Sequence, residues 1–201
     1  MEYIISIIIG YLLGCSHMSF YLSKIKKVDI KSKGSKNYGA SNTMALLGWK
    51  YGILTGFHDI TKSIIAILIV KYLYPNNIYL PLITGVCCVL GHIYPFYLHF
   101  DGGKGFASYV GLIFAINWKF GIIMAITIIL ITLITDYIVL ATFTTITITP
   151  IAIAIIYQNI YAFLLLLPIT IIIFIKHKEN ILRLKNGTEM KLSKANQKEY
   201  R

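Results

Sequence analysis

The residues of this chain that could do chemistry lie in three short polar segments. The second of these, residues 91–108, places two histidines, an aspartate, a lysine and several glycines within an otherwise apolar chain. Polar groups are costly in a bilayer, and in apolar chains they usually line a site enclosed by protein or filled with water. Here Gly102-Gly103-Lys104-Gly105 precedes an apolar run. Backbone amides at a helix start, together with one lysine, form a pocket suited to a phosphate or an oxyanion.

The spacing within this segment argues against two common binding sites. A Walker A loop would need a serine or threonine after its lysine, whereas Lys104 is followed by Gly105. His92 and His99 are seven residues apart, but Pro95 lies between them and no carboxylate or cysteine completes a metal set. We therefore expect neither a zinc site nor an organic cofactor.

The first polar segment, residues 34–43, consists of glycine, hydroxyl and amide residues. Glycines allow positive φ and bring backbone N–H groups close to an anion, while serine and asparagine add neutral donors. Loops of this composition are also common where nothing binds. The candidate phosphate-binding residues are Gly34, Ser35, Asn37, Gly39, Ser41 and Asn42.

The third polar segment, residues 177–189, follows the last apolar run. His177, Asn180 and Arg183 recur every three residues, so a helix would present imidazole, amide and guanidinium toward one side. A basic helix that binds lipid headgroups beside a membrane would have a similar composition. The residues of this segment alone leave both interpretations open.

Composition identifies the chain as an integral membrane protein. Of its 201 residues 57% are hydrophobic and 13% charged, and the mean hydropathy is +0.71. Such a chain lacks the polar surface of a soluble domain. The net charge of +11 does not indicate nucleic-acid binding, because the lysines lie between apolar runs; contact with anionic lipid is expected instead. We interpret residues 1–201 as a single membrane domain.

Seven apolar runs predict an all-α protein with seven transmembrane helices. The fourth and fifth runs are short against the roughly 20 residues of a full span. Backbone near Gly102–Gly105 is therefore expected at membrane depth inside the bundle. The predicted spans are residues 3–23, 52–74, 78–98, 104–117, 119–135, 137–157 and 159–175.

The distribution of lysine and arginine predicts the orientation. Residues 24–50 carry seven lysines and residues 176–201 carry eight lysines and arginines, whereas the turns near Pro75 and Gln158 carry none. By the positive-inside rule both basic segments are cytoplasmic, and seven spans then place the N-terminus outside. Residues 176–201 become a cytoplasmic C-terminal segment. The three polar segments and the turn at Asp136 then share the cytoplasmic face.

Three further lysines within the runs receive structural interpretations. Lys71 and Lys119 lie near the outer ends of spans, where a long side chain can extend toward water. Lys62 follows Asp59 by three residues on one helix face. This pair is either a buried ion pair or a support for the site.

Taken together, the three segments resemble those of the bacterial acyl-phosphate-dependent glycerol-3-phosphate acyltransferase family (PlsY type). The resemblance covers nearly the whole chain, with the three motifs in order and the expected number of spans between them. In the first motif the matching residues are Gly34, Ser35, Asn37, Gly39, Ala40 and Asn42; in the second, Gly91, His92, Pro95, Phe100 and Gly102 to Gly105; in the third, His177, Asn180, Ile181, Arg183, Leu184, Gly187 and Glu189.

This resemblance implies an enzyme of the cell membrane that moves a fatty acyl group from acyl phosphate to the sn-1 hydroxyl of glycerol 3-phosphate. The product is lysophosphatidic acid, a precursor of phospholipids. The expected partners are acyl phosphate, glycerol 3-phosphate and membrane lipid, with the enzyme that produces acyl phosphate as a further candidate contact; no nucleic-acid partner is expected.

The resemblance also suggests roles for individual residues. Lys104 and the backbone of Gly102 and Gly103 would stabilise a phosphate or an oxyanion, and Gly105 and His92 are counted among the substrate-binding residues. Ser35, Asn37 and Asn42 would orient phosphates, with Ser35 counted among the catalytic residues. His177 is the candidate base, with a substrate phosphate as the alternative. Asn180 and Arg183 would hold a substrate, and Glu189 is assigned a structural role.

The chain departs from the family pattern at three positions. Lys36 replaces a glycine, Ala45 replaces an arginine, and Val139 replaces one of two hydroxyl residues, the other being Thr142. Losing the arginine removes a charge-assisted contact to phosphate, and we hypothesise that Lys36 restores that charge. In that case Lys36→Gly would abolish activity.

These departures keep a divergent paralogue with lost or altered activity as the alternative function. A small transporter is a weaker one, because the polar residues gather at one membrane face and no inverted repeat is visible.

Overall fold

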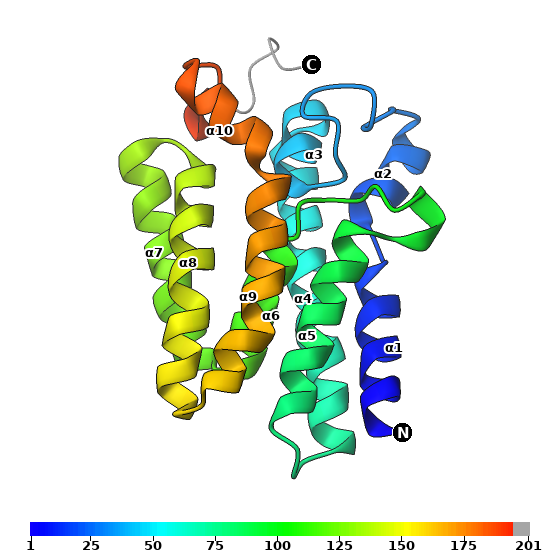
Figure 1. Cartoon of the computed structure of the whole chain (residues 1–201). Coiled ribbons are helices and arrows are strands. Elements are labelled where there is room, and N and C mark those ends of the chain that lie inside the picture. Colours follow the sequence, from blue (N-terminus) through cyan, green and yellow to red (C-terminus); the bar gives the residue numbers. More distant parts are fainter. Residues whose placement is uncertain (195–201) are drawn as a thin grey trace.

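The computed structural model describes residues 1–194, and this part of the chain contains helices and loops without any strand (Figure 1). The helices pack side by side as a bundle. They are α1 (Glu2–Gly14), α2 (Met18–Lys26), α3 (Ala40–Leu47), α4 (Trp49–Leu73), α5 (Tyr79–Ile93), α6 (Phe106–Ile116), α7 (Trp118–Thr135), α8 (Ile138–Tyr157), α9 (Ile160–Lys176) and α10 (Lys178–Lys185), with 3-10 turns at Phe96–Leu98 and Leu192–Lys194. Residues 195–201 of the predicted C-terminal segment lie outside the described range.

Five helical stretches are long and apolar enough to cross a membrane, and they coincide with five of the predicted spans. They are Glu2–Lys26, Trp49–Leu73, Tyr79–Leu98, Trp118–Thr135 and Ile138–Tyr157. The pair α9 and α10, bent by 47°, raises the number to six if it forms one span. The all-helical membrane fold is thus confirmed. The predicted fourth span corresponds to α6, which has only 11 residues, about 16 Å of helix.

The first span is broken where the sequence predicted one continuous helix. The chain leaves the helix at Cys15 and re-enters it after His17, whose backbone is extended. Side chains satisfy the carbonyl groups that this break exposes: Lys62 Nζ donates to Ser16 O (2.6 Å) and Tyr97 Oη to Cys15 O (2.7 Å). Backbone groups freed at membrane depth need such partners, so the break depends on polar residues from other helices.

Helix α6 forms the centre of the bundle. Eight of its eleven residues are buried, and Tyr109, Leu112 and Ile113 belong to the main apolar cluster. Because protein surrounds α6, its short length does not expose its ends to lipid. Its first residue, Phe106, follows the loop that carries Lys104, and Gly102, Gly103 and Gly105 of that loop are buried.

The far end of α6 is completed by two side chains from other helices. Lys71 Nζ of α4 donates to Ala115 O (2.5 Å), and Tyr157 Oη of α8 donates to Ile116 O (3.2 Å). The last carbonyls of a helix lack partners within the helix, and a lysine there also favours the negative end of its dipole. Lys71 is therefore structural, as expected, but it binds α6 rather than extending toward water.

The polar segments gather at one end of the bundle. Figure 1 shows α3, α10 and the loop before α3 at the end opposite the N-terminus of α1. Residues of the second segment reach the same end through the loop between α5 and α6. The fold thus brings together segments far apart in the sequence.

We predict that Lys71→Met destabilises the protein, because the carbonyl of Ala115 loses a charged donor. The expected cost is about 1–3 kcal/mol. Thermal unfolding in detergent measures it, with Lys119→Met as the matched control, since Lys119 is exposed and its Nζ lies 5.8 Å from the ring of its neighbour Trp118. Equal melting temperatures for the two variants would contradict the capping role.

Candidate active site

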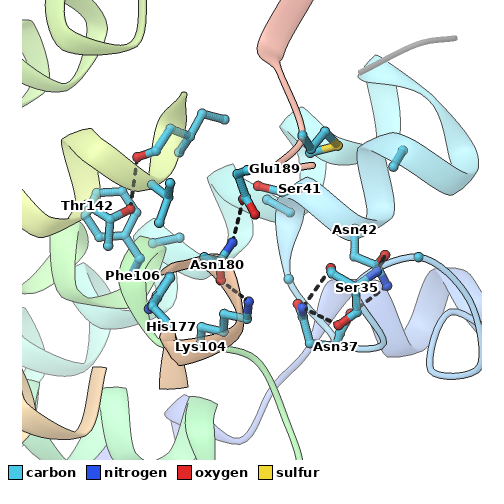
Figure 2. A pocket seen from close by; sticks show the side chains of 18 of the residues that line it. Ser35, Asn37, Ser41, Asn42, Lys104, Phe106, Thr142, His177, Asn180 and Glu189 are labelled. Carbon is cyan, nitrogen blue, oxygen red and sulfur yellow. Dashed lines mark hydrogen bonds between the residues drawn. The ribbon is translucent and has the colours of Figure 1, made fainter. Parts of the chain in front are cut away.

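One cavity of about 320 Å³ is lined by residues of all three polar segments (Figure 2). It lies between the loop and start of α3, the start of α6, the start of α8, and α10. The sequence-predicted residues among its lining are Gly34, Ser35, Asn37, Gly39, Ser41, Asn42, His92, Lys104, Gly105, His177, Asn180 and Arg183. Gly102 and Gly103 are the two predicted residues that do not line it.

The first segment is held in shape by the side chain of Asn42. Its amide nitrogen donates to the carbonyls of Ile30 (2.9 Å) and Asn37 (3.0 Å), while its Oδ1 accepts from Ser35 N (2.8 Å). Gly34 has φ +60°, and a Cβ there would lie 2.3 Å from Asn42 Oδ1. Since Asn42 is buried and its amide is occupied by the loop, we correct its predicted role from orienting a phosphate to folding the loop.

Ser35 is oriented by Asn37. The Asn37 side-chain nitrogen donates to Ser35 Oγ (2.8 Å) and to Ser35 O (3.0 Å). A hydroxyl oxygen that accepts one hydrogen bond still has its own hydrogen to donate. Ser35 can therefore donate to an anion in the cavity.

Lys104 is joined to the third segment by a chain of hydrogen bonds. Lys104 Nζ donates to Asn180 Oδ1, Asn180 Nδ2 donates to Glu189 Oε1 (2.6 Å), and Arg183 Nε donates to Glu189 Oε2 (2.8 Å). Glu189 is buried and balances Arg183, which also lies 3.7 Å from Glu179. The contacts support a structural role for Glu189, because its carboxylate fixes the amide of Asn180.

Burial lowers the pKa of Lys104 from 10.5 to about 8, with a further contribution from the positive charge of Arg183. Glu189 and Glu179 act in the opposite direction. Lys104 lies in the loop between α5 and α6, outside the helices long enough to span a membrane. At neutral pH the ammonium form predominates, and it loses its proton in the mildly alkaline range.

The contacts of His177 fix its tautomer. Its Nδ1 lies 2.8 Å from Ile173 O, and because a carbonyl can only accept, Nδ1 carries the hydrogen. In the neutral ring Nε2 is then the acceptor. His177 lines the cavity, and Nε2 is the ring nitrogen left without a hydrogen.

The backbone amides of Gly102 and Gly103 already have partners. Gly102 N donates to Ile93 O (3.0 Å), and Gly103 N donates to His92 O (3.1 Å). Donors used in this way are not free to form an oxyanion hole, so the predicted role of these two glycines is corrected. Their contacts instead fold the loop back onto the end of α5 and thereby position Lys104.

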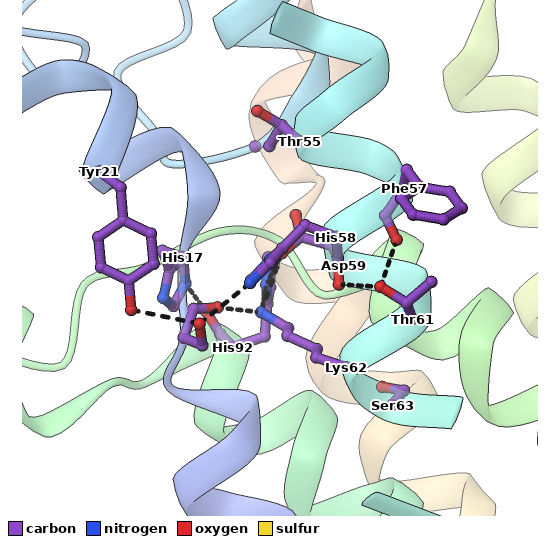
Figure 3. A network of polar contacts seen from close by, with 12 residues as sticks. His17, Tyr21, Thr55, Phe57, His58, Asp59, Thr61, Lys62, Ser63 and His92 are labelled. Atoms are coloured by element: carbon purple, nitrogen blue, oxygen red, sulfur yellow. Dashed lines mark hydrogen bonds and ion pairs between the residues drawn. The ribbon is translucent and has the colours of Figure 1, made fainter. Parts of the chain in front are cut away.

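A buried polar network lies behind this loop (Figure 3). Lys62 Nζ donates to His92 Nδ1 (2.8 Å) and lies 2.9 Å from Asp59 Oδ1. Because an ammonium group only donates, neutral His92 carries its hydrogen on Nε2. A Cβ at Gly103 would lie 2.0 Å from that Nε2. Of the two interpretations left open for Asp59 and Lys62, the contacts favour support of the site.

His17 belongs to the same network and was missed in the sequence. Its ring stacks on that of His92, with centroids 4.8 Å apart, and its Nε2 lies 2.9 Å from His92 O. A histidine inside an apolar run was the available signal. Its partners are 75 residues away along the chain, so the pattern could not name them.

Two helix N-termini open into the cavity. Gly39 and Ser41 line it at the start of α3, and Gly105 and Ala107 line it at the start of α6. The first N–H groups of a helix have no partners within it and favour negative charge. Both helix starts are therefore candidate anion sites besides the side chain of Lys104.

The apolar side of the cavity was also missed. Five apolar residues belong to its lining: Phe106, Ile138, Val139, Met190 and Leu192. Figure 2 shows Phe106 and Thr142 on one side of Asn180, and Ser35 and Asn37 on the other. Single apolar residues in a largely apolar chain carry no signal of their own.

A family model described as glycerol-3-phosphate acyltransferase matches residues 4–187. The chain belongs to this family. Curated glycerol-3-phosphate acyltransferases similar to it include one from Oceanobacillus iheyensis, 38% identical over 96% of both chains, and one from Thermosipho melanesiensis, 37% identical over 95% of this chain and 93% of that one.

Two solved structures have the same fold. Both are of PlsY, an integral membrane glycerol 3-phosphate acyltransferase. Its glycerol 3-phosphate form is 31% identical with a TM-score of 0.88, covering 95% of this chain and 96% of the other. Its lysophosphatidic acid form is 30% identical with a TM-score of 0.86, covering 97% and 98%.

The departures from the family pattern separate into two groups. Ala45, Val139 and Thr142 line the cavity, so the missing arginine and the missing hydroxyl both change the site itself. Lys36 is exposed and does not line the cavity. The hypothesis that Lys36 replaces the arginine therefore finds no support in the structure.

We predict that Gly103→Ala destabilises the protein by about 1–3 kcal/mol, because its methyl group overlaps His92 Nε2. Most of this cost should vanish in a His92→Ala background, and unfolding measurements on the four variants of the double-mutant cycle give the coupling. Gly56→Ala is the control, since its Cβ would meet only Ala40 Cβ at 3.6 Å. Additive costs for Gly103→Ala and His92→Ala would refute the proposed packing.

Proposed function

We propose that this protein transfers a fatty acyl group from acyl phosphate to the sn-1 hydroxyl of glycerol 3-phosphate, producing lysophosphatidic acid. The observation that carries this proposal is one cavity lined both by polar groups from three segments and by apolar side chains. The two PlsY structures, in glycerol 3-phosphate and lysophosphatidic acid forms, support the same substrate and product.

We further propose seven membrane crossings in the plasma membrane, with the N-terminus outside and the basic C-terminal segment in the cytoplasm. In this arrangement α6, surrounded by protein, is the short fourth crossing, and α9 is the seventh. The seven lysines of residues 24–50 lie at the same end as α10, as the positive-inside rule requires. The cavity then faces the compartment that holds glycerol 3-phosphate. Contact with the enzyme that supplies acyl phosphate remains a prediction.

Phosphate binding is assigned to Lys104, Ser35 and the two helix N-termini. Lys104 supplies a full charge, Ser35 supplies a neutral donor, and the first turns of α3 and α6 supply backbone amides. Arg183 lines the cavity but shares its charge with Glu189. Both substrates carry a phosphate, and two helix N-termini suit two anions.

In the reaction the sn-1 oxygen attacks the acyl carbon. A new carbon–oxygen ester bond forms as the bond between that carbon and the phosphate oxygen breaks, and the hydroxyl proton ends on the departing phosphate. His177 Nε2 can accept this proton in between, or the phosphate can take it directly. The leaving group is already good, so alignment of the two substrates and charge stabilisation supply most of the catalysis.

A divergent activity is the second candidate, and the cavity position of Ala45 favours it. A cavity that lacks the arginine of the family pattern could select another polyol phosphate. Purified protein in lipid, supplied with labelled glycerol 3-phosphate and with acyl phosphate, acyl-CoA or acyl carrier protein as donor, separates the candidates. Absence of lysophosphatidic acid from every donor would reject the leading proposal.

We predict that Lys104→Ala lowers kcat/KM at least about a hundredfold, because one charged donor to the transition state is lost. Initial rates of product formation measure the effect. Lys119→Ala should leave the rate within about twofold, as Lys119 is exposed on α7 and outside the cavity. Comparable losses in the two variants would contradict the assignment.

The activity should also depend on pH through Lys104. Because burial lowers its pKa to about 8, the ammonium is present below that value and is lost as pH rises through it. We expect kcat/KM to fall about tenfold per pH unit above pH 8, after correction for spontaneous donor hydrolysis. Lys104→Arg, where it retains activity, should remove this fall, since arginine keeps its proton. A flat profile to pH 9.5 in the parent enzyme would disprove the dependence.

A further inference from the structure

Residues 188–194, here called the strap, follow α10 and cross the cavity to the turn between α7 and α8. Thr188, Glu189, Met190 and Leu192 of the strap all line the cavity. The strap is the last part of the chain that the structure describes.

The first end of the strap is attached to α10. Thr188 N donates to Arg183 O (2.8 Å), and Glu189 accepts from the side chains of Asn180 and Arg183. Figure 2 shows Glu189 above Asn180, between the Thr142 and Ser35 sides of the cavity. This end is thus continuous with the polar half of the site.

The second end is attached to Asp136. This residue is the C-cap of α7 and has a φ of +65°. Its two carboxylate oxygens accept from Ser193 N (2.9 Å) and Ser193 Oγ (2.6 Å), and its carbonyl accepts from Leu192 N (2.9 Å). Lys191 Nζ lies 5.8 Å from the ring centroid of Tyr137. One turn between two helices thus holds three consecutive residues of the strap.

Between these attachments the strap turns apolar side chains toward the cavity. Met190 and Leu192 line it together with Ile138 and Val139 from the start of α8. Leu192 lies beside the start of α8, because its N–H donates to Asp136 O, so Leu192, Ile138 and Val139 form an apolar wall. This wall offers no hydrogen-bond partner to the hydroxyl and phosphate groups of glycerol 3-phosphate. It does suit an acyl phosphate, whose chain begins directly beside its phosphate and carbonyl.

We propose that the strap determines specificity for the acyl donor. Leu192, with Ile138 and Val139, binds the first methylene groups of the acyl chain, and Asp136 keeps this wall in place. This inference rests on the proposed function, of which it names the donor-selecting residues.

The test compares two small donors as competitive inhibitors of transfer from a long-chain acyl phosphate. Butyryl phosphate has methylene groups, whereas acetyl phosphate has the same phosphate and carbonyl without them. Leu192→Ala should raise the inhibition constant of butyryl phosphate about tenfold, the equivalent of most of one buried leucine side chain. It should leave that of acetyl phosphate within twofold, and leave the KM for glycerol 3-phosphate unchanged.

Asp136→Ala should also raise the inhibition constant of butyryl phosphate and leave that of acetyl phosphate nearly unchanged. The reason is that the strap loses its attachment to Asp136, so Leu192 no longer lines the cavity. Ser193→Ala, which removes one of the contacts, is the milder substitute if Asp136→Ala does not fold. Lys194→Ala, at an exposed position on the same strap, is the control and should change neither constant.

Two results would overturn the proposal. If the inhibition constants of acetyl and butyryl phosphate rise equally, the substitutions act on phosphate binding and not on the acyl chain. If the melting temperature falls while the ratio of the two constants stays unchanged, the strap only stabilises the fold. An inactive parent protein would refute the proposed function, whereas an active one with an unchanged ratio refutes only the role of the strap.

Discussion

The hydrogen bond from Lys104 to Asn180 joins the two halves of the site, and the other contacts of the cavity are arranged around it. Lys104 belongs to the loop folded onto α5, and Asn180 belongs to α10, beyond the last apolar helix. The loop is held in place by the hydrogen bond from Gly103 N to His92 O. The side-chain amide of Asn180 is held in place by its hydrogen bond to Glu189. A shift of either support would move a charged donor in a site where alignment supplies much of the catalysis.

The short central helix explains why this loop can lie inside the bundle. A helix of 11 residues cannot cross the hydrocarbon region alone, so both its ends need partners within the protein. At the far end Lys71 and Tyr157 provide them. At the near end the first turn opens into the cavity, where a substrate anion can meet its amides. One shortened helix thus places the unpaired amides of its first turn beside the cavity.

The sequence identified the three segments, because polar residues stand out among apolar spans and their order matches a known pattern. It could not assign the partners within each segment. Asn42 and Ser35 are both small polar residues of one loop, yet the first is occupied by three carbonyls of the chain and the second keeps a donor free. His17 and the apolar wall were missed for a related reason. Their roles depend on residues distant along the chain, and an apolar residue among many others has no pattern of its own.

The charges around the cavity indicate how phosphate can bind without the arginine of the family pattern. Among the residues described as its lining, Arg183 is paired with Glu189, and Asp59 is paired with Lys62 behind the wall. Lys104 is bonded to a neutral amide and keeps its charge for a ligand. One lysine does not balance two phosphates, and under the proposed function the starts of α3 and α6 would supply the remaining stabilisation. A backbone amide stabilises an anion only when its N–H group is close and points at it. Under the proposed function, anion binding therefore depends more on the conformation of the loops before α3 and α6 than on the number of cationic side chains.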